Sequence, residues 1–231
     1  MIIFYVVSLL KEGMVVVTSD NKLKFYSVGE EIVNSVTHGV GSLLAIAACV
    51  ILIVTAAMKG GAMRVVSASV YGATLIMMFT MSTLYHALTN DRAKRVFRVF
   101  DHTSIFLLIA GTYTPVALVT LRGKIGWTVF GIVWGISLIG IVLNAIDIER
   151  FKKVSVLSYI IMGWCSLLTF YQLLKTITKG GIIFLIVGGA LYTVGVIFYK
   201  MKKVRYMHSI WHLFVLGGAI MHYFCIQLYV I

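Results

Sequence analysis

Seven long apolar stretches divide the chain, and short polar segments separate them. The stretches cover residues 35–58, 65–87, 102–121, 127–147, 154–174, 182–199 and 209–231. Each is close to the roughly 20 apolar residues that an α-helix needs to cross the hydrocarbon core of a bilayer. The pattern therefore predicts an all-α, polytopic membrane protein that folds as a bundle of seven transmembrane helices.

The polar segments between the stretches are short, and the longest runs from residue 88 to residue 101. None is long enough for a folded domain, so any function is expected inside the bundle or at its rim. We divide the chain into an N-terminal cytoplasmic or interfacial segment, 1–34, and a transmembrane domain, 35–231. Residues 1–10 lack the basic region and cleavage site of a signal peptide. They are either an interfacial segment or the result of a start upstream of Met14.

Composition supports the membrane class. Hydrophobic residues make up 60% of the chain and charged residues only 12%, with a mean hydropathy of +0.99. Soluble domains are about 45–50% apolar and about 25% charged, so a soluble protein is excluded. The three cysteines lie within apolar stretches and have no metal-binding spacing, so we interpret them as small hydrophobic residues.

The net charge of +12 is distributed unevenly along the chain. The second, fourth and sixth connections carry eleven basic residues, and the first, third and fifth carry six. Cytoplasmic loops are the ones enriched in lysine and arginine. This bias predicts an N-terminus inside and a C-terminus outside, and attraction to anionic lipid headgroups rather than to nucleic acid.

Ionisable side chains inside a helix bundle are costly, so each is a candidate for function. Glu31, Asn34 and His38 share one face of the first helix, while Ser82 and His86 share a face near the end of the second. Asp101 opens the third apolar stretch, and His208 and His212 stand one turn apart on the seventh. The predicted topology places Glu31, His86, Asp101, His208 and His212 at one level, just within the cytoplasmic face.

Three histidines at one level are typical of a catalytic zinc site, which keeps a fourth position for water. The HxxxH spacing of His208 and His212 presents two imidazoles on one helix face. We predict His86, His208 and His212 as Zn²⁺ ligands and Asp101 as a base that orients water and accepts its proton. Ser82 is predicted to donate to a developing oxyanion. The alternatives are that Asp101 only caps a helix and that Ser82 only bonds its own backbone.

Other polar or special residues are expected outside the metal site. His102 is predicted to face away from Asp101, and His222, about 15 Å deeper than His212, to bond a neighbouring helix. Pro115 is expected to kink the third helix. Gly131 and Gly135 form a GxxxG pattern, which indicates close helix packing either within the chain or in a dimer.

Four segments carry a family resemblance: EEIVNSVTHG (30–39), MSTLYHAL (81–88), FDHTSIFLLIAGTYTP (100–115) and HSIWHLFVLGG (208–218). They resemble the haemolysin III family, the bacterial branch of the progestin and adipoQ receptor family. The wider group is one of seven-helix membrane hydrolases that includes the alkaline ceramidases. The resemblance implies a zinc site built from Ser82, His86, Asp101, His208 and His212, and a place in the bacterial cytoplasmic membrane.

From the residues and the resemblance we expect a zinc-dependent membrane hydrolase that cleaves a lipid amide or ester bond. The resemblance also implies a part in membrane-lipid homeostasis, with a membrane lipid as substrate or ligand. Two alternatives stay open: a haemolysin-type pore or channel, and a receptor-like protein in which zinc is structural. Neither a ring of acidic nor one of basic pore-lining residues is evident, which counts against the channel.

The charge bias generates a testable topology. A reporter fused after Ile231 is expected to be extracytoplasmic, and one inserted in residues 200–208 to be cytoplasmic, because the basic sixth connection stays inside. Paired alkaline phosphatase and fluorescent protein fusions measure both positions. A cytoplasmic signal from the C-terminal fusion would invert the topology and place the histidine layer at the outer face.

Overall fold

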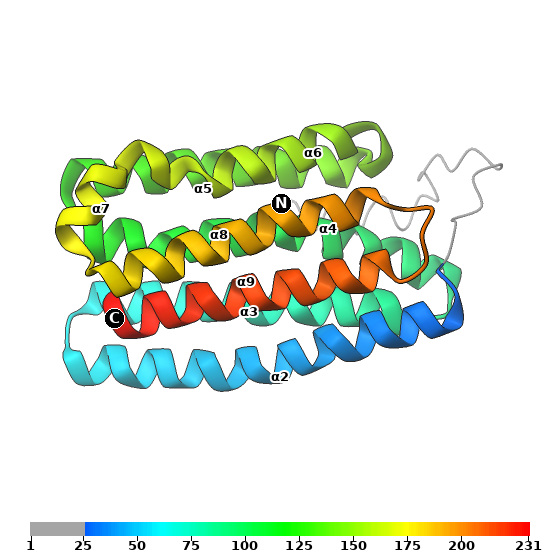
Figure 1. The fold of residues 1–231 in the computed structure, drawn as a ribbon, viewed down its shortest axis with the longest axis horizontal. Coiled ribbons are helices and arrows are strands. Elements are labelled where there is room, and N and C mark those ends of the chain that lie inside the picture. The colour runs from blue at the N-terminus through cyan, green and yellow to red at the C-terminus, as the bar shows by residue number, and fades with distance from the viewer. Residues whose placement is uncertain (1–25) are drawn as a thin grey trace.

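The computed structural model describes residues 26–231, which form long helices and contain no strand. Its α-helices are α2 (Val28–Lys59), α3 (Ala62–Ala87), α4 (Asp91–Pro115), α5 (Gly123–Ile146), α6 (Ile148–Gly163), α7 (Phe170–Thr176), α8 (Lys179–Lys200) and α9 (Met207–Tyr229). A π-helical segment, η1 (Val116–Leu121), follows α4, and a 3₁₀ segment, η2 (Cys165–Thr169), joins α6 to α7. The long helices lie side by side along one axis (Figure 1).

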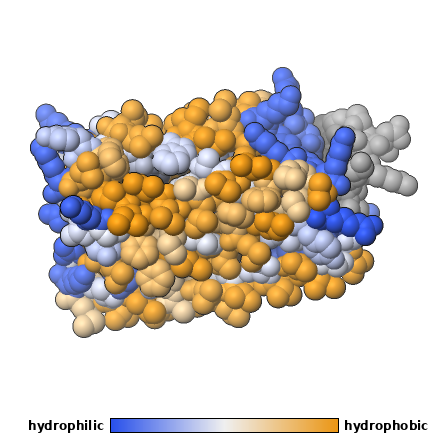
Figure 2. Space-filling model, viewed as in Figure 1, coloured by the Kyte–Doolittle hydropathy of each residue, from blue (hydrophilic) through white to orange (hydrophobic). Residues whose placement is uncertain are grey.

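The predicted seven-helix membrane architecture is confirmed. Within residues 26–231, seven helical units are long and apolar enough to cross a membrane, with α4 and η1 forming the third and α6, η2 and α7 the fifth. Figure 2 shows apolar residues over the middle of the visible face and hydrophilic residues at its two ends. Many large apolar side chains, such as Leu43 and Ile139, point outward, as expected for a surface that lipid covers.

Helix α2 begins earlier than the apolar pattern predicts, at Val28 rather than near residue 35. Ser27 and Glu30 form a capping box: the Ser27 hydroxyl accepts from the Glu30 backbone, and the Glu30 carboxylate accepts from the Ser27 backbone at 3.0 Å. These contacts satisfy two helix-end donors. With 32 residues, α2 is about 48 Å long and extends beyond a hydrocarbon core of about 30 Å.

The second connection is far shorter than predicted. Only Leu88–Asn90 joins α3 to α4, and the Asn90 side chain accepts from the backbones of Arg92 and Ala93 at 3.1 Å each. The basic residues of this segment belong to the first turns of α4. Hydropathy finds where a helix is apolar and not where it begins, because a helix continues past the hydrocarbon core when its first turn is capped.

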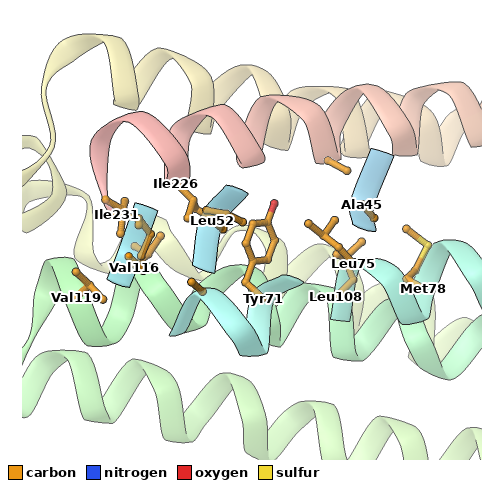
Figure 3. Close-up of a cluster of buried hydrophobic side chains, with 14 of the residues drawn as sticks. Ala45, Leu52, Tyr71, Leu75, Met78, Leu108, Val116, Val119, Ile226 and Ile231 are labelled. Atoms are coloured by element: carbon orange, nitrogen blue, oxygen red, sulfur yellow. The ribbon is translucent and has the colours of Figure 1, made fainter. Parts of the chain in front are cut away.

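The main core lies where α2, α3, α4, η1 and α9 meet. Figure 3 shows Leu52, Tyr71 and Ile226, from three different helices, packed against one another in it. Gly72 allows α2 and α3 to approach closely, since an added Cβ there would lie 2.3 Å from the Cys49 sulfur. Small residues at such positions are a usual device of membrane helix packing. A second core cluster, which includes Phe106 and Val133, joins α4 to α5 and α6.

The predicted special residues have different outcomes. α4 continues to Pro115 and then widens into the π-helical turn of η1, a known way to absorb a proline in a membrane helix. An added Cβ at Gly131 or Gly135 would meet nothing within 4 Å. The GxxxG pattern therefore mediates no close packing within the described part of the chain.

Candidate metal centre

Three histidines meet at the end of the bundle where α2 and α9 begin and α3 ends. We call this the histidine end. His208 and His212 stand one turn apart on α9, and their Nε2 atoms are 3.1 Å apart. His86, on the last turn of α3, joins them, and one nitrogen from each of the three rings lies within 4.8 Å of the others.

Helix α2 orients two of these rings. The Glu31 carboxylate accepts from Nδ1 of His86 at 2.6 Å, and the Asn34 carbonyl accepts from Nδ1 of His212 at 3.3 Å. A proton on Nδ1 leaves Nε2 as the unprotonated nitrogen of a neutral imidazole. The Asn34 side chain is itself held, because its Oδ1 accepts from the Ser209 hydroxyl at 2.6 Å.

The geometry fits a metal ion. Two imidazoles bound to one tetrahedral Zn²⁺ at 2.0–2.1 Å hold their nitrogens about 3.3 Å apart, close to the separation between His208 and His212. Nε2 of His86 is buried and has no hydrogen-bond partner among the residues that the structure describes. Buried polar atoms normally have one, so an unpartnered nitrogen beside two others is placed to bind a metal ion. These three histidines can hold a metal ion.

Glu31 also joins a buried ion pair. Its Oε1 lies 2.7 Å from Nζ of Lys94, whose ammonium group also donates to the Leu88 carbonyl at 3.3 Å. The two side chains are only 14% and 5% exposed. One carboxylate thus contacts both a histidine of α3 and a lysine of α4, and fixes three helices to each other at the histidine end.

A mainly apolar cavity of about 130 Å³ begins at this cluster and runs between α3, α4, α6, α8 and α9. Ser82, Asp101, His208 and His212 line it together with apolar residues such as Leu108. The structure therefore brings both predicted catalytic residues to the same cavity as two of the predicted ligands. His86 is not among the residues that line it.

The structure contradicts the alternatives that Asp101 only caps a helix and that Ser82 only bonds its own backbone. Asp101 does not cap a helix, because α4 starts ten residues earlier and Asn90 is its cap. The Ser82 hydroxyl is buried and makes no hydrogen bond to its own backbone or to any other described group. Asp101 is not a member of the group of close metal-binding atoms, and its carboxylate lies 3.5 Å from Nδ1 of His102.

The remaining histidines divide between the cavity and the helix contacts. The prediction for His102 is wrong, since it lines the cavity beside Asp101. Its ring lies against the preceding turn of α4, where Nδ1 donates to the Arg98 carbonyl at 3.0 Å. His222 lies 3.3 Å from the Leu185 carbonyl of α8, which confirms its predicted bond to a neighbouring helix. His38 stacks on His212, with ring centroids 3.6 Å apart.

Two residues at the site escaped prediction. Tyr26 stacks on His208 at a centroid distance of 4.7 Å and covers the histidines from the chain segment before α2. Burial raises the pKa of its phenol well above the ordinary value, so it stays neutral. Lys94 lies in the segment 88–101, which the hydropathy pattern predicts to be a connection. Neither position has a signal in the hydropathy pattern, because each depends on a contact with another helix.

Fold and site together define a polytopic helical membrane protein with a histidine cluster that can hold a metal ion. Residues 26–223 match the family described as haemolysin-III related. The chain is 45% identical to Hemolysin-3 of Bacillus cereus over 88% of its own length and 93% of that protein. It is 41% identical to the Hemolysin-3 homolog of Bacillus subtilis (strain 168), over 88% of this chain and 96% of that one.

The chain therefore belongs to the haemolysin III family, as its motifs predict. A more distant relative is the human Monocyte to macrophage differentiation factor. It is 28% identical over 71% of this chain and 70% of the length of that protein. The family match, residues 26–223, contains six of the seven helical units whole and the seventh up to residue 223. It thus includes every helix that positions the histidines.

The buried carboxylate generates a stability prediction. Glu31→Gln keeps the shape but removes the negative charge that His86 and Lys94 contact, and we expect a loss of about 3 kcal/mol, seen as a clear fall in melting temperature in detergent. The control is Glu149→Gln, because Glu149 is 55% exposed and pairs with Arg98. An exposed pair contributes about 1 kcal/mol or less. Equal falls in melting temperature in the two variants would show that the Glu31 contacts stabilise the protein no more than an exposed ion pair does.

Proposed function

We propose that this protein is a zinc-dependent membrane hydrolase that cleaves an amide or ester bond of a lipid. One observation carries the proposal: three imidazoles converge at the histidine end, and two of them line one end of an apolar cavity together with Asp101 and Ser82. His86, His208 and His212 would hold the ion. Zn²⁺ with three protein ligands and an open fourth position supplies Lewis acidity and lowers the pKa of water to about 7.

The chain's own residues supply the remaining chemistry. Asp101 lines the cavity and has a carboxylate to orient a water molecule and take its proton. The Ser82 hydroxyl is buried without a partner and can donate to the oxygen of the substrate carbonyl as charge develops on it. Glu31 and the Asn34 carbonyl keep Nδ1 of His86 and His212 protonated, and so keep Nε2 directed to the ion.

The cavity supports a lipid substrate rather than a soluble one. Beyond its polar end the lining is apolar, with residues such as Leu108, Ile109 and Val215. A hydrocarbon chain gains free energy by entering such a space, while a polar substrate loses its hydration. We place the protein in the bacterial cytoplasmic membrane, with the histidine end toward the cytoplasm, and infer a part in membrane-lipid homeostasis.

The metal site is tested by composition. Purified protein is expected to contain about one zinc ion per chain by plasma mass spectrometry. His208→Ala and His212→Ala should each lose most of it, since water replaces an imidazole poorly. His222→Ala is the matched control, because it removes a histidine from the same helix ten residues further along. Unchanged zinc in both ligand variants, or equal loss in the control, refutes the site as drawn.

Asp101→Asn separates hydrolysis from a structural use of zinc. It keeps shape and hydrogen bonding but removes the proton acceptor. We expect zinc content and melting temperature to be retained, while fatty acid release from N-acyl and O-acyl lipids falls about 10²–10⁴-fold.

Each other outcome has a distinct meaning. Loss of zinc together with turnover would make Asp101 a ligand. Normal turnover in the variant would exclude it as the base. If His86→Ala abolishes an ion conductance instead of turnover, the pore alternative replaces the hydrolase. If it abolishes only folding, zinc is structural.

A further inference from the structure

The end of the bundle opposite the histidines carries positive charge without acidic residues. We call it the basic end, and its basic residues are Lys59, Arg64, Arg122, Lys124, Lys175 and Lys179. All the acidic residues that the structure describes lie elsewhere: Glu30, Glu31, Asp91, Asp101, Asp147 and Glu149. The metal centre and the proposed hydrolysis make no use of this charge. The enrichment of lysine and arginine in cytoplasmic loops does not explain it either, because this end is predicted to lie outside.

Two of the arginines share a hollow. A space of about 340 Å³ lies between the α2–α3 turn and the junction of η1 with α5, and Arg64 and Arg122 both line it. The rest of its wall is glycine and apolar residues, including Trp127, with no acidic side chain. Two like charges at one small space repel each other, so an anion between them would be stabilised.

The backbone holds both guanidinium groups in place. Nη1 of Arg64 donates to the carbonyls of Lys59 and Gly60 at 3.4 and 3.3 Å, and Nε of Arg122 donates to the Val119 carbonyl at 2.7 Å. Nε of Arg64 is buried and has no hydrogen-bond partner within the described part of the chain. Neither arginine therefore has a carboxylate partner among the described residues, and one buried donor is unsatisfied.

The main chain on both walls is shaped by turns that leave the space open. Gly60, Gly61, Arg122 and Gly123 all have positive φ, from 52° to 96°. A Cβ added at any of the three glycines would meet nothing within 4 Å. These residues are where α3 and α5 begin, and neither helix has a side-chain cap there, so the partial positive charge of their first turns adds to that of the arginines.

We propose that this hollow binds a phosphate group between Arg64 and Arg122. A guanidinium presents paired donors that match the oxygens of a phosphate, and both arginines lack an acidic competitor. Trp127 is 55% exposed at the start of α5, as is usual for tryptophan at the level of lipid headgroups. The phosphate can come from an anionic lipid headgroup or from inorganic phosphate in solution.

The test uses the full-length protein in detergent and two probes. One is phosphatidylglycerol in mixed micelles, with phosphatidylcholine as reference, and the other is sodium phosphate, with sodium chloride at equal ionic strength. We expect phosphatidylglycerol, sodium phosphate or both to raise the melting temperature in a saturable way. Arg64→Gln/Arg122→Gln should weaken the fitted affinity by at least about tenfold, since each lost charge-assisted contact is strong.

The matched control is Lys175→Gln/Lys179→Gln. It removes the same charge from the same end but does not touch the hollow, so it should keep the wild-type response. If the double arginine variant fails to fold, Arg64→Lys retains the charge without the paired donors and should still weaken binding. A response to the lipid alone identifies a headgroup site, and a response to phosphate alone identifies a soluble anion.

Two results would overturn the proposal. The first is an equal loss of response in the lysine and arginine variants, which would mean that only the overall charge of this end matters. The second is the absence of any saturable response to either probe in the wild-type protein.

Discussion

The structure depends on how a bundle made of apolar helices accommodates the largely buried carboxylate of Glu31. A lone charge in such surroundings is very costly, so Glu31 must have partners on other helices. It finds them in His86 of α3 and Lys94 of α4, at 2.6 and 2.7 Å. Meeting this requirement fixes where α2, α3 and α4 stand relative to each other. The contact with Glu31 also keeps the proton of the His86 ring on Nδ1, which leaves Nε2 free of a proton beside the two histidines of α9.

The start of α9 is attached to α2 in a similar way. The Tyr206 backbone, in a left-handed conformation just before α9, donates to the Glu30 carboxylate at 2.8 Å, and Ser209 donates to the Asn34 side chain. The first turns of α2 thus contact both helices that carry the clustered histidines, α3 and α9. A metal site needs such support, because ligands on separate helices keep their separation only if the helices do.

The two ends of the bundle differ in how charge is compensated. At the histidine end, basic side chains face carboxylates, as in the pairs of Glu31 with Lys94 and Glu149 with Arg98. At the basic end, the contacts of Arg64 and Arg122 with the described residues are hydrogen bonds to backbone carbonyls. Carboxylates of the chain itself therefore compensate part of the positive charge at the histidine end, whereas the charge at the basic end depends on water, lipid or a bound anion.

The sequence alone determined the number of membrane helices, the family, and which three histidines meet at the histidine end, since hydropathy, spacing and motif order are local properties of the chain. It failed where a contact between helices decides. α4 starts at Asp91 because Asn90 caps it, although the charges of that segment resemble a loop. His102 lies in the cavity, Lys94 is buried against Glu31, and Tyr26 covers His208, although nothing in their neighbouring residues indicates it. Only the tertiary structure selects the partner of a buried polar group, because that partner is dozens of residues away in the chain.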